Sequence, residues 1–367
     1  MKILLIKTSS LGDVLHTLPA LSDAMKQFPH LEVTWVLEES FAPIASWHPA
    51  VKKVLPIALR RWRRHFSFKS LGEIKQFLKA LRAERYDYII DAQGLLKSAI
   101  ISRLARGPRY GFDRPSAREP FASFFYQHKI SVDKNQHAIV RLRQLFSKIL
   151  ALPSFQQSSS TVEPLDYGLV LPSSIITREP VTETIQQNSQ SLDCFAPLAM
   201  TGQKYLLFLH ATTWKTKLYP ETYWRRLIQY ATEQGYRVIL PWGNVDEKAR
   251  SERLAKDLPG SIVPPALNLI ELATLLKGAS GVIAVDTGLG HLAAALSVPT
   301  LSLYGPTNPN RTGTLGKHQI HLAAQFECAP CLQRHCTYKE KKDVFPACFT
   351  MLSPEKVWKE FEGVLVC

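Results

Sequence analysis

The feature that most constrains the fold of this chain is a repeated alternation of short apolar runs with amphipathic segments. Apolar runs of strand length stand at 2–7, 31–37 and 86–93, and the alternation starts again at 204–210 and 281–286. Between these runs, apolar residues recur at the spacing of a helix. Strands that alternate with helices favour βαβ units and parallel sheets. We therefore predict an α/β fold of two doubly wound, Rossmann-like domains that face a central cleft.

A stretch rich in Ser, Gln and Pro separates the two predicted halves. Residues 152–203 contain the Ser- and Gln-rich run SFQQSSSTVEP, and Pro recurs through them, which is typical of a linker. We therefore predict an N-terminal domain over 1–151 and a C-terminal domain over 204–350. The tail at 351–367 contains SPEKVWKEFEGVL, which predicts a final helix.

Positive charge is concentrated in the first half of the chain. The net charge is +14; residues 1–150 hold 25 Lys and Arg against 12 Asp and Glu, whereas the remaining residues hold 20 against 19. This asymmetry favours an anionic partner, which could be nucleic acid, a phosphorylated substrate or an acidic membrane surface. A charge excess that only keeps the protein dissolved is the alternative.

The sequence indicates neither a membrane span nor a secretion signal. No run approaches the roughly 20 apolar residues that a spanning helix needs. The N-terminal MKILLIKTSSLGD turns polar too early for a signal peptide and has no small-residue cleavage site. We therefore expect a cytoplasmic protein whose first apolar run is a strand.

The loop from Thr8 to Asp13 follows the first predicted strand, where doubly wound folds place ligand contacts. It lacks GxGxxG, so a dinucleotide site is not indicated here. Asp13 stands near a predicted helix start and could cap that helix. It could instead be a general base that faces the ligand. The local sequence by itself favours the cap.

A second loop, Asp286-Thr287-Gly288, follows an apolar strand and opens a helix in the second half. Exposed N–H groups at such a start bind phosphate, and Gly allows close approach. His291 lies one turn into the helix and could reach the same anion. The alternative is an ordinary strand–helix turn in which Asp286 is the cap.

A third loop, 210–217, follows the first predicted strand of the second half. It carries the hydroxyls of Thr212 and Thr213 and two lysines, Lys215 and Lys217. Hydroxyls and lysines above a sheet suit a diphosphate, and a lysine can neutralise a leaving phosphate. Polar loops are common, so this pattern alone is weak.

Four arginines surround a tryptophan in the run RRWRRH at 60–65. Arginines can grip phosphate or carboxylate groups through paired hydrogen bonds. Nucleic-acid binding is a rival interpretation, but no RNP, zinc-finger or helix-turn-helix pattern accompanies the run. A solvated charge run is the other alternative.

Four cysteines, Cys328, Cys331, Cys336 and Cys348, lie close together near the C-terminus. Four thiols could hold zinc, but the spacing lacks the paired CxxC knuckles of common zinc ribbons. A cytoplasmic location argues against structural disulfides. Free thiols in a compact loop are therefore favoured, and metal binding stays open.

Taken together, these segments resemble the type I lipopolysaccharide heptosyltransferases of glycosyltransferase family 9. The resemblance covers most of 1–150 and 204–310, and the linker and the tail after about 315 are outside it. The segments that carry it are KTSSLGDVLHTLPAL, IASWHPAV, IALRRWRR, DAQGLLKSA, AREPFASFFY, HATT, LPWG, VDTGLGHLAAAL and YGPTNP.

The resemblance implies a GT-B fold and transfer of L-glycero-D-manno-heptose from ADP-heptose to the inner Kdo of Kdo2–lipid A. It implies inversion at the anomeric carbon, with neither a metal nor another cofactor. The N-terminal domain would bind the acceptor and the C-terminal domain ADP-heptose. The enzyme would touch the cytoplasmic face of the inner membrane peripherally and would bind no nucleic acid.

The resemblance also assigns roles to residues. Asp13 matches the general base, and Lys217 would help the ADP leaving group. The implied donor contacts are Thr212, Thr213, Lys217, Glu247, Asp286, Thr287, Gly288 and His291. The implied acceptor contacts are Ser10, Arg60, Arg61, Arg63, Arg64 and Arg118. The implied set contains no metal ligand. Lys215 stands close enough to Lys217 in the sequence to share its role.

Three other functions compete with this one. A heptosyltransferase that adds a later heptose is one, because the cysteine-rich tail looks more like types II and III of the same family. A non-catalytic protein that binds nucleotide sugar or lipopolysaccharide is another, although it would not need a base such as Asp13. A nicotinamide-dependent oxidoreductase fits the fold class alone and is disfavoured by the missing GxGxxG.

Overall fold

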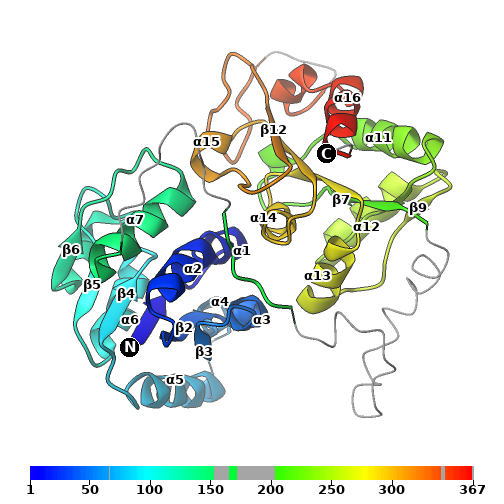
Figure 1. Cartoon of the computed structure of the whole chain (residues 1–367). Helices are drawn as coiled ribbons and strands as arrows, with labels where there is room; N and C mark the ends of the chain where they lie inside the picture. Colours follow the sequence, from blue (N-terminus) through cyan, green and yellow to red (C-terminus); the bar gives the residue numbers. More distant parts are fainter. Residues whose placement is uncertain (66, 153–164, 172–202, 340–343, 366–367) are drawn as a thin grey trace, which may run out of the picture. The chain divides into compact units, whose positions relative to one another are not determined.

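The computed structural model describes residues 1–65, 67–152, 165–171, 203–339 and 344–365. The chain divides into two compact units, Met1–Val170 and Leu171–Cys367 (Figure 1). Each unit contains one six-stranded sheet, and the described strands of both sheets pair in parallel. The predicted pair of parallel α/β domains is confirmed, whereas the cleft between them stays a prediction.

The first sheet has the strand order β3-β2-β1-β4-β5-β6. Its central strand β1 pairs with β2 on one side and β4 on the other, and Ile3 through Ile6 are fully buried. Burial on both faces explains why this strand is a continuous apolar run rather than an alternating one. The strands are β1 (Lys2–Ile6), β2 (Glu32–Glu38), β3 (Val51–Ile57), β4 (Tyr88–Asp91), β5 (Arg109–Phe112) and β6 (His128–Ile130).

Helices connect these strands and bury their apolar faces on the sheet. Trp62, Phe77 and Ile101, from three different helices, share one apolar cluster with Leu4 and Ile6 of β1. The helices are α1 (Leu11–Leu15), α2 (Leu18–Gln27), α3 (Ala42–Ser46), α4 (Leu59–Arg64), α5 (Phe68–Leu81), α6 (Leu96–Leu104) and α7 (Ala138–Leu150), with 3-10 helices η1 (Glu39–Phe41) and η2 (Pro120–Phe125).

Part of the predicted linker packs against the first unit. Tyr167 is buried, and the N–H of Val170 donates to the carbonyl of Trp47 at 2.9 Å. Gly168 has a φ of +60°, and a Cβ there would lie 2.6 Å from the His48 ring, so the chain approaches this ring closely. The rest of the predicted linker, at 153–164 and 172–202, lies outside the described residues.

The second sheet has the strand order β12-β11-β10-β7-β8-β9. Its strands are β7 (Tyr205–Leu209), β8 (Arg237–Ile239), β9 (Ser261–Ile262), β10 (Gly281–Val285), β11 (Thr300–Tyr304) and β12 (Gln319–Ala323). The helices of this unit are α11 (Glu221–Glu233), α12 (Val245–Ala255), α13 (Leu269–Lys277), α14 (Gly288–Ala295), α15 (Pro309–Thr312) and α16 (Pro354–Leu365), with 3-10 helices η4 (Lys215–Lys217) and η5 (Ala347–Met351).

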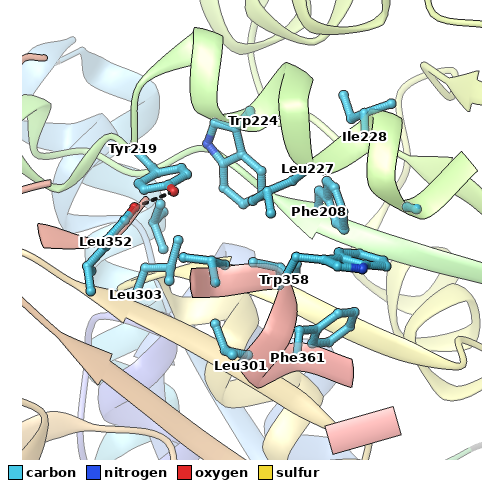
Figure 2. Packing of buried hydrophobic residues seen from close by; sticks show 14 of the residues in the cluster. Phe208, Tyr219, Trp224, Leu227, Ile228, Leu301, Leu303, Leu352, Trp358 and Phe361 are labelled. Atoms are coloured by element: carbon cyan, nitrogen blue, oxygen red, sulfur yellow. Dashed lines mark hydrogen bonds between the residues drawn. The ribbon is translucent and has the colours of Figure 1, made fainter. Parts of the chain in front are cut away.

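The final helix α16, which the sequence predicts, belongs to the core of the second unit. Its Trp358 and Phe361 join one buried cluster with Trp224 of α11 and with Leu301 and Leu303 of β11 (Figure 2). In the same view, the Tyr219 hydroxyl donates to the Leu352 carbonyl at 2.6 Å. Buried aromatic side chains contribute most to such a core, so the C-terminal tail is part of this domain rather than an appendage.

Candidate active site

Each sheet has one point at which the order of its strands reverses along the chain. In the first unit this point lies between β1 and β4, and in the second unit it lies between β7 and β10. Doubly wound sheets bind ligands at the carboxyl ends of the strands that flank such a point. The loops after β1 and β4 therefore mark a candidate site in the first unit, and those after β7 and β10 mark one in the second unit.

Asp13 follows β1 and is the third residue of α1. Its Oδ2 accepts a hydrogen bond from the backbone N–H of Ser10 at 2.8 Å, and the Ser10 hydroxyl lies 3.4 Å from the same oxygen. This is the contact that a capping carboxylate makes, so Asp13 does cap its helix. The other oxygen, Oδ1, faces the ammonium of Lys7 at 3.4 Å. The Asp13 side chain remains 28% exposed, so a ligand can reach it.

The surroundings keep Asp13 ionised. Burial by itself would raise the pKa of this carboxyl, but the charge of Lys7 and the N–H of Ser10 act against it. The charge of Arg118 adds to the same effect, so the pKa of Asp13 lies below its ordinary value. The sequence does not single out Lys7, because this residue looks like the end of the first apolar strand. A Lys at the carboxyl end of a buried strand is the signal that could have identified it.

The loop after β4 supports the loop that carries Asp13. Oε1 of Gln93 accepts hydrogen bonds from the backbone N–H groups of Thr8 at 3.1 Å and Ser9 at 3.4 Å. Gln93 is itself held by Asp91, whose Oδ1 accepts from the Gln93 N–H at 2.8 Å and whose Oδ2 accepts from the Tyr126 hydroxyl at 2.7 Å. Burial raises the pKa of Asp91 despite these hydrogen bonds. Asp91 and Gln93 lie in the quoted segment DAQGLLKSA but carry no role from the sequence alone.

The structure separates the arginines of α4 into two groups. Arg61 pairs with Glu39 at 3.2 Å and Glu73 at 3.0 Å, and both carboxylates raise its pKa further. Within the described residues, Arg63 and Arg64 have no ion-pair partner, and both are exposed. Arg61 therefore holds α4 against its neighbours, and an anion would have to compete with two carboxylates for it. Arg63 and Arg64 fit the predicted anion contact better.

Arg60 and Arg118 lie toward the carboxyl ends of the central strands. Arg60 lowers the pKa of Glu38, the last residue of β2, although burial, the larger effect, raises it. Arg118 lies close enough to Asp13 to lower its pKa. Both guanidinium groups thus lie near the sheet edge that carries Asp13, and their contact with an acceptor stays a prediction.

In the second unit, Lys217 and Asp286 form an ion pair with 2.7 Å between Nζ and Oδ2. Thr307 donates to the same oxygen at 2.7 Å, and the Thr212 hydroxyl donates to the Asp286 carbonyl at 3.2 Å. The structure therefore brings together three predicted donor contacts from the loops after β7 and β10. Lys215 is exposed, so Lys217 is the lysine of this loop that enters the cluster.

The helix α14 begins immediately beside this ion pair. Thr287 occupies the N-cap position and Gly288 is the first helical residue. The interpretation of Asp286 as the helix cap is wrong, because Thr287 holds that position and the Asp286 carboxylate binds Lys217 and Thr307. The first N–H groups of a helix have no partner within it, so this start can bind an anion. His291 is buried one turn further on.

Thr213 and Glu247 lie on neighbouring loops of the same sheet edge. Thr213 is exposed on the loop after β7. Glu247 follows β8, the strand next to β7, and its Oε2 accepts a hydrogen bond from the Gly243 N–H at 2.8 Å. This contact tightens the turn before α12 and leaves the second carboxylate oxygen of Glu247 for a ligand.

The four cysteines of the tail are free thiols that line one cavity together with Thr216 and Pro306. Among the described residues, no three His, Cys, Asp or Glu side chains are arranged to hold a metal ion. Burial and the three neighbouring thiols raise the pKa of Cys348 to about 12, so this thiol stays protonated. These four thiols form no disulfide, as predicted, whereas metal binding by them stays open.

Comparisons with known proteins show the family to which the chain belongs. The family described as Glycosyltransferase family 9 (heptosyltransferase) matches residues 74–342. Lipopolysaccharide heptosyltransferase 1 of Pseudomonas aeruginosa is 47% identical over 378 residues, which span 100% of this chain and 98% of the relative. Its counterpart from Escherichia coli K12 is 44% identical over 329 residues, 89% of this chain and 95% of the relative.

A solved structure shows the same architecture. Escherichia coli heptosyltransferase WaaC with ADP superposes with a TM-score of 0.80 at 40% identity, over 99% of this chain and 100% of that one. The predicted GT-B fold is thereby confirmed. By sequence and by fold, the chain belongs to glycosyltransferase family 9, the heptosyltransferases.

Proposed function

We propose that this enzyme transfers L-glycero-D-manno-heptose from ADP-heptose to the inner Kdo of Kdo2–lipid A. The observation that carries the proposal is the ionised, partly exposed carboxylate of Asp13 at the switch point of the first unit. The donor is supported by the WaaC structures, which were solved with ADP and with ADP-2-deoxy-2-fluoro heptose. The acceptor is supported by the type 1 relatives, which are lipopolysaccharide heptosyltransferases.

On the acceptor side, Asp13 acts as the general base. Its Oδ1 takes the proton of the acceptor hydroxyl while the hydroxyl oxygen attacks the anomeric carbon of the heptose. The Ser10 N–H holds Oδ2 and so fixes the orientation of the carboxylate. A single displacement from the face opposite the phosphate inverts the anomeric carbon.

On the donor side, the bond between the anomeric carbon and the phosphate oxygen breaks, and the electron pair stays with ADP. The new negative charge is met by Lys217 and by the first N–H groups of α14. The hydroxyls of Thr212 and Thr213 are donors on the same edge. These groups supply positive charge without a metal ion, so the proposed reaction is metal-independent.

Exposed cations of the first unit attract the acceptor. Kdo carries a carboxylate and lipid A carries phosphates, and each can accept two parallel hydrogen bonds from one guanidinium. Arg63, Arg64, Arg60 and Arg118 are exposed and bind these groups in this proposal, with the Ser10 hydroxyl next to the reacting hydroxyl. Arg61 contributes indirectly, by holding α4 in place.

The acceptor is a lipid, so the enzyme works at the cytoplasmic face of the inner membrane. Across the parts of the chain that are described, no helix is both long and apolar enough to cross a bilayer. We therefore propose peripheral contact with the membrane, with no nucleic-acid partner.

The proposal is tested by incubating the purified protein with ADP-heptose and Kdo2–lipid A. ADP release that requires the acceptor, together with a gain of one heptose in the mass spectrum of the product, is the expected result. Transfer only to an acceptor that already carries a heptose would show that the enzyme adds a later heptose of the inner core. Binding of ADP-heptose without any transfer would make the protein a binding protein.

A further inference from the structure

A pair of phenylalanine side chains projects into solvent from η2. Phe121 is 63% exposed and Phe124 is 65% exposed, with their ring centroids 6.2 Å apart. A 3-10 helix has three residues per turn, so residues three apart lie on one face. Ala122 and Ser123 between them are buried. Both rings thus point into solvent, while the buried Ala122 and Ser123 hold η2 on the domain.

The helix α6 extends this apolar surface. Leu96 and Ile100, four residues apart on one helix face, are 39% and 48% exposed. Ala99 of α6 packs with Ala122 and Tyr126, which lie in and just after η2, in one buried cluster. The Leu96 N–H donates to Oε2 of Glu119 at 2.7 Å, so the start of α6 is tied to the start of η2. We call Leu96, Ile100, Phe121 and Phe124 the apolar patch.

The apolar patch lies in a cationic segment of the chain. The segment 96–130, which contains it, holds seven Lys and Arg against two Asp and Glu. Lys129 places its ammonium 6.0 Å from the centre of the Phe124 ring, and Lys97 follows Leu96 directly and is exposed. Exposed aromatic rings beside lysines are what a protein presents to the interface of an anionic bilayer, where rings enter the headgroup region and cations meet lipid phosphates.

The apolar patch lies at the same end of the first sheet as Asp13. In a parallel sheet the connecting helices run opposite to the strands, so α6 starts at the carboxyl edge. The Glu119 N–H, directly before η2, donates to the Gly94 carbonyl at 2.9 Å, and Gly94 belongs to the loop that supports Thr8 and Ser9. Arg118, one residue earlier, acts on Asp13. A surface that meets the patch therefore also comes close to the base.

Charge decides between a bilayer and a second copy of the chain. A symmetric dimer through the apolar patch would bring the cationic segments 96–130 of both copies together, and their like charges would repel. An anionic bilayer supplies the opposite charge and covers the exposed rings. Apolar side chains gathered on a surface mark a contact with another molecule, and the positive charge of the segment favours a bilayer as that partner.

We propose that the apolar patch docks the enzyme on an anionic phospholipid bilayer, with Phe121 and Phe124 inserted among the headgroups and Lys97 and Lys129 bound to lipid phosphates. The docking itself is independent of the reaction, while the link to the lipid-borne acceptor rests on the proposed function. Docking by this surface places the Asp13 edge of the sheet next to the membrane that holds the acceptor.

The experiment is flotation of the purified full-length chain with vesicles of phosphatidylglycerol mixed with phosphatidylethanolamine, compared with phosphatidylcholine vesicles. We expect binding to the anionic vesicles and a loss of about tenfold or more in partitioning for Phe121→Ala combined with Phe124→Ala. Phe345→Ala is the matched control, because Phe345 is 67% exposed and lies in the second unit. Phe124→Trp should retain binding, since Trp is also an interfacial side chain. Wild-type partitioning of the double alanine variant would overturn the proposal.

Two further measurements separate this proposal from its alternatives. In sedimentation velocity, a wild-type dimer that the double variant converts to a monomer would make the patch a subunit interface and overturn bilayer docking. In activity assays, the double variant should lose turnover with vesicle-borne acceptor and keep wild-type turnover with a deacylated, water-soluble acceptor; equal loss with both would overturn the link to the acceptor. A wild-type protein that binds vesicles but transfers no heptose would contradict the proposed function and leave docking supported.

Discussion

The ammonium nitrogen of Lys7 lies 3.4 Å from Oδ1 of Asp13, and it also donates to the carbonyl of Ala92 at 3.1 Å. Lys7 is nearly buried, at 6% exposure, so water screens its charge little. One side chain thereby connects the ends of β1 and β4 and sets the charge state of the candidate base.

Replacing Lys7 by Met should move the acid limb of the kcat profile to higher pH. Burial raises the pKa of Asp13 and Lys7 is the largest opposing influence, so its removal raises that pKa. The active form is the carboxylate, which is lost as pH falls through the pKa; a higher pKa therefore means loss of activity at a higher pH. Measuring kcat against pH for both proteins tests this, and superimposable profiles would exclude Lys7 from the control of the base.

Replacing Asp13 by Asn should lower kcat by roughly 10²–10⁴-fold, the usual contribution of a general base. The amide oxygen of Asn can still accept the Ser10 hydrogen bond, so the helix cap is retained and the loss reports on chemistry. The KM for ADP-heptose should change little. Thermal unfolding of the variant provides the control, and turnover close to that of the wild type would remove Asp13 from the mechanism.

Replacing Lys217 by Met should lower kcat/KM for ADP-heptose by roughly 10²-fold, because a preorganised charge at the leaving group is lost. Lys215→Met is the matched control on the same loop and should have a much smaller effect. The substitution also leaves Asp286 without its cation. The double variant Lys217→Met/Asp286→Asn separates the two causes, since recovery of activity there would assign the loss to the unpaired carboxylate.

Replacing Arg63 and Arg64 together by Ala should raise the acceptor KM about tenfold, which corresponds to roughly 1.4 kcal/mol. Because exposed charges are screened by salt, the acceptor KM of the variant should also depend less on ionic strength. Arg61→Ala should affect the acceptor KM less, as its guanidinium is occupied by Glu39 and Glu73. If Arg61→Ala raised the acceptor KM more than the double variant does, Arg61 rather than Arg63 and Arg64 would be the acceptor contact.

Turnover should survive EDTA, because Lys217 and the start of α14 supply the charge that a metal would otherwise provide. The measurement is ADP release before and after chelation, with metal analysis of the same protein to account for the cysteines. Loss of activity that magnesium restores would show that the reaction needs a metal.

The sequence predicts the central strands of both sheets and misses several at their edges. β1 and β10 are buried on both faces, and their continuous apolar runs are visible without a structure. β6, with the sequence HKI, is mostly exposed and carries no apolar run. Such a strand is defined by pairing with its neighbour, and pairing depends on residues that are distant in the sequence.

The loops that carry Asp13 and Asp286 are predictable because each follows an apolar strand, whereas the roles of these two residues come from the family resemblance and stay predictions. Pairings between distant segments could not be predicted from the sequence. RRWRRH shows four equivalent arginines, and only the fold brings Glu39 and Glu73 to one of them. From the sequence, a helix cap and a general base are alternatives for Asp13. In the structure the cap uses only Oδ2 of the carboxylate, so Oδ1 is left for a second role.

The ion pair between Lys217 and Asp286 gives the proposed ADP-heptose site its own internal counter-ion. A small anion such as inorganic phosphate must displace a carboxylate 2.7 Å from the ammonium before it gains the full attraction of Lys217. A diphosphate that also contacts the start of α14 can compensate for that exchange. In the proposed reaction, the Asp286 carboxylate pairs with Lys217 again when ADP leaves, and this would favour product release. We therefore expect inorganic phosphate to inhibit the enzyme far more weakly than ADP does.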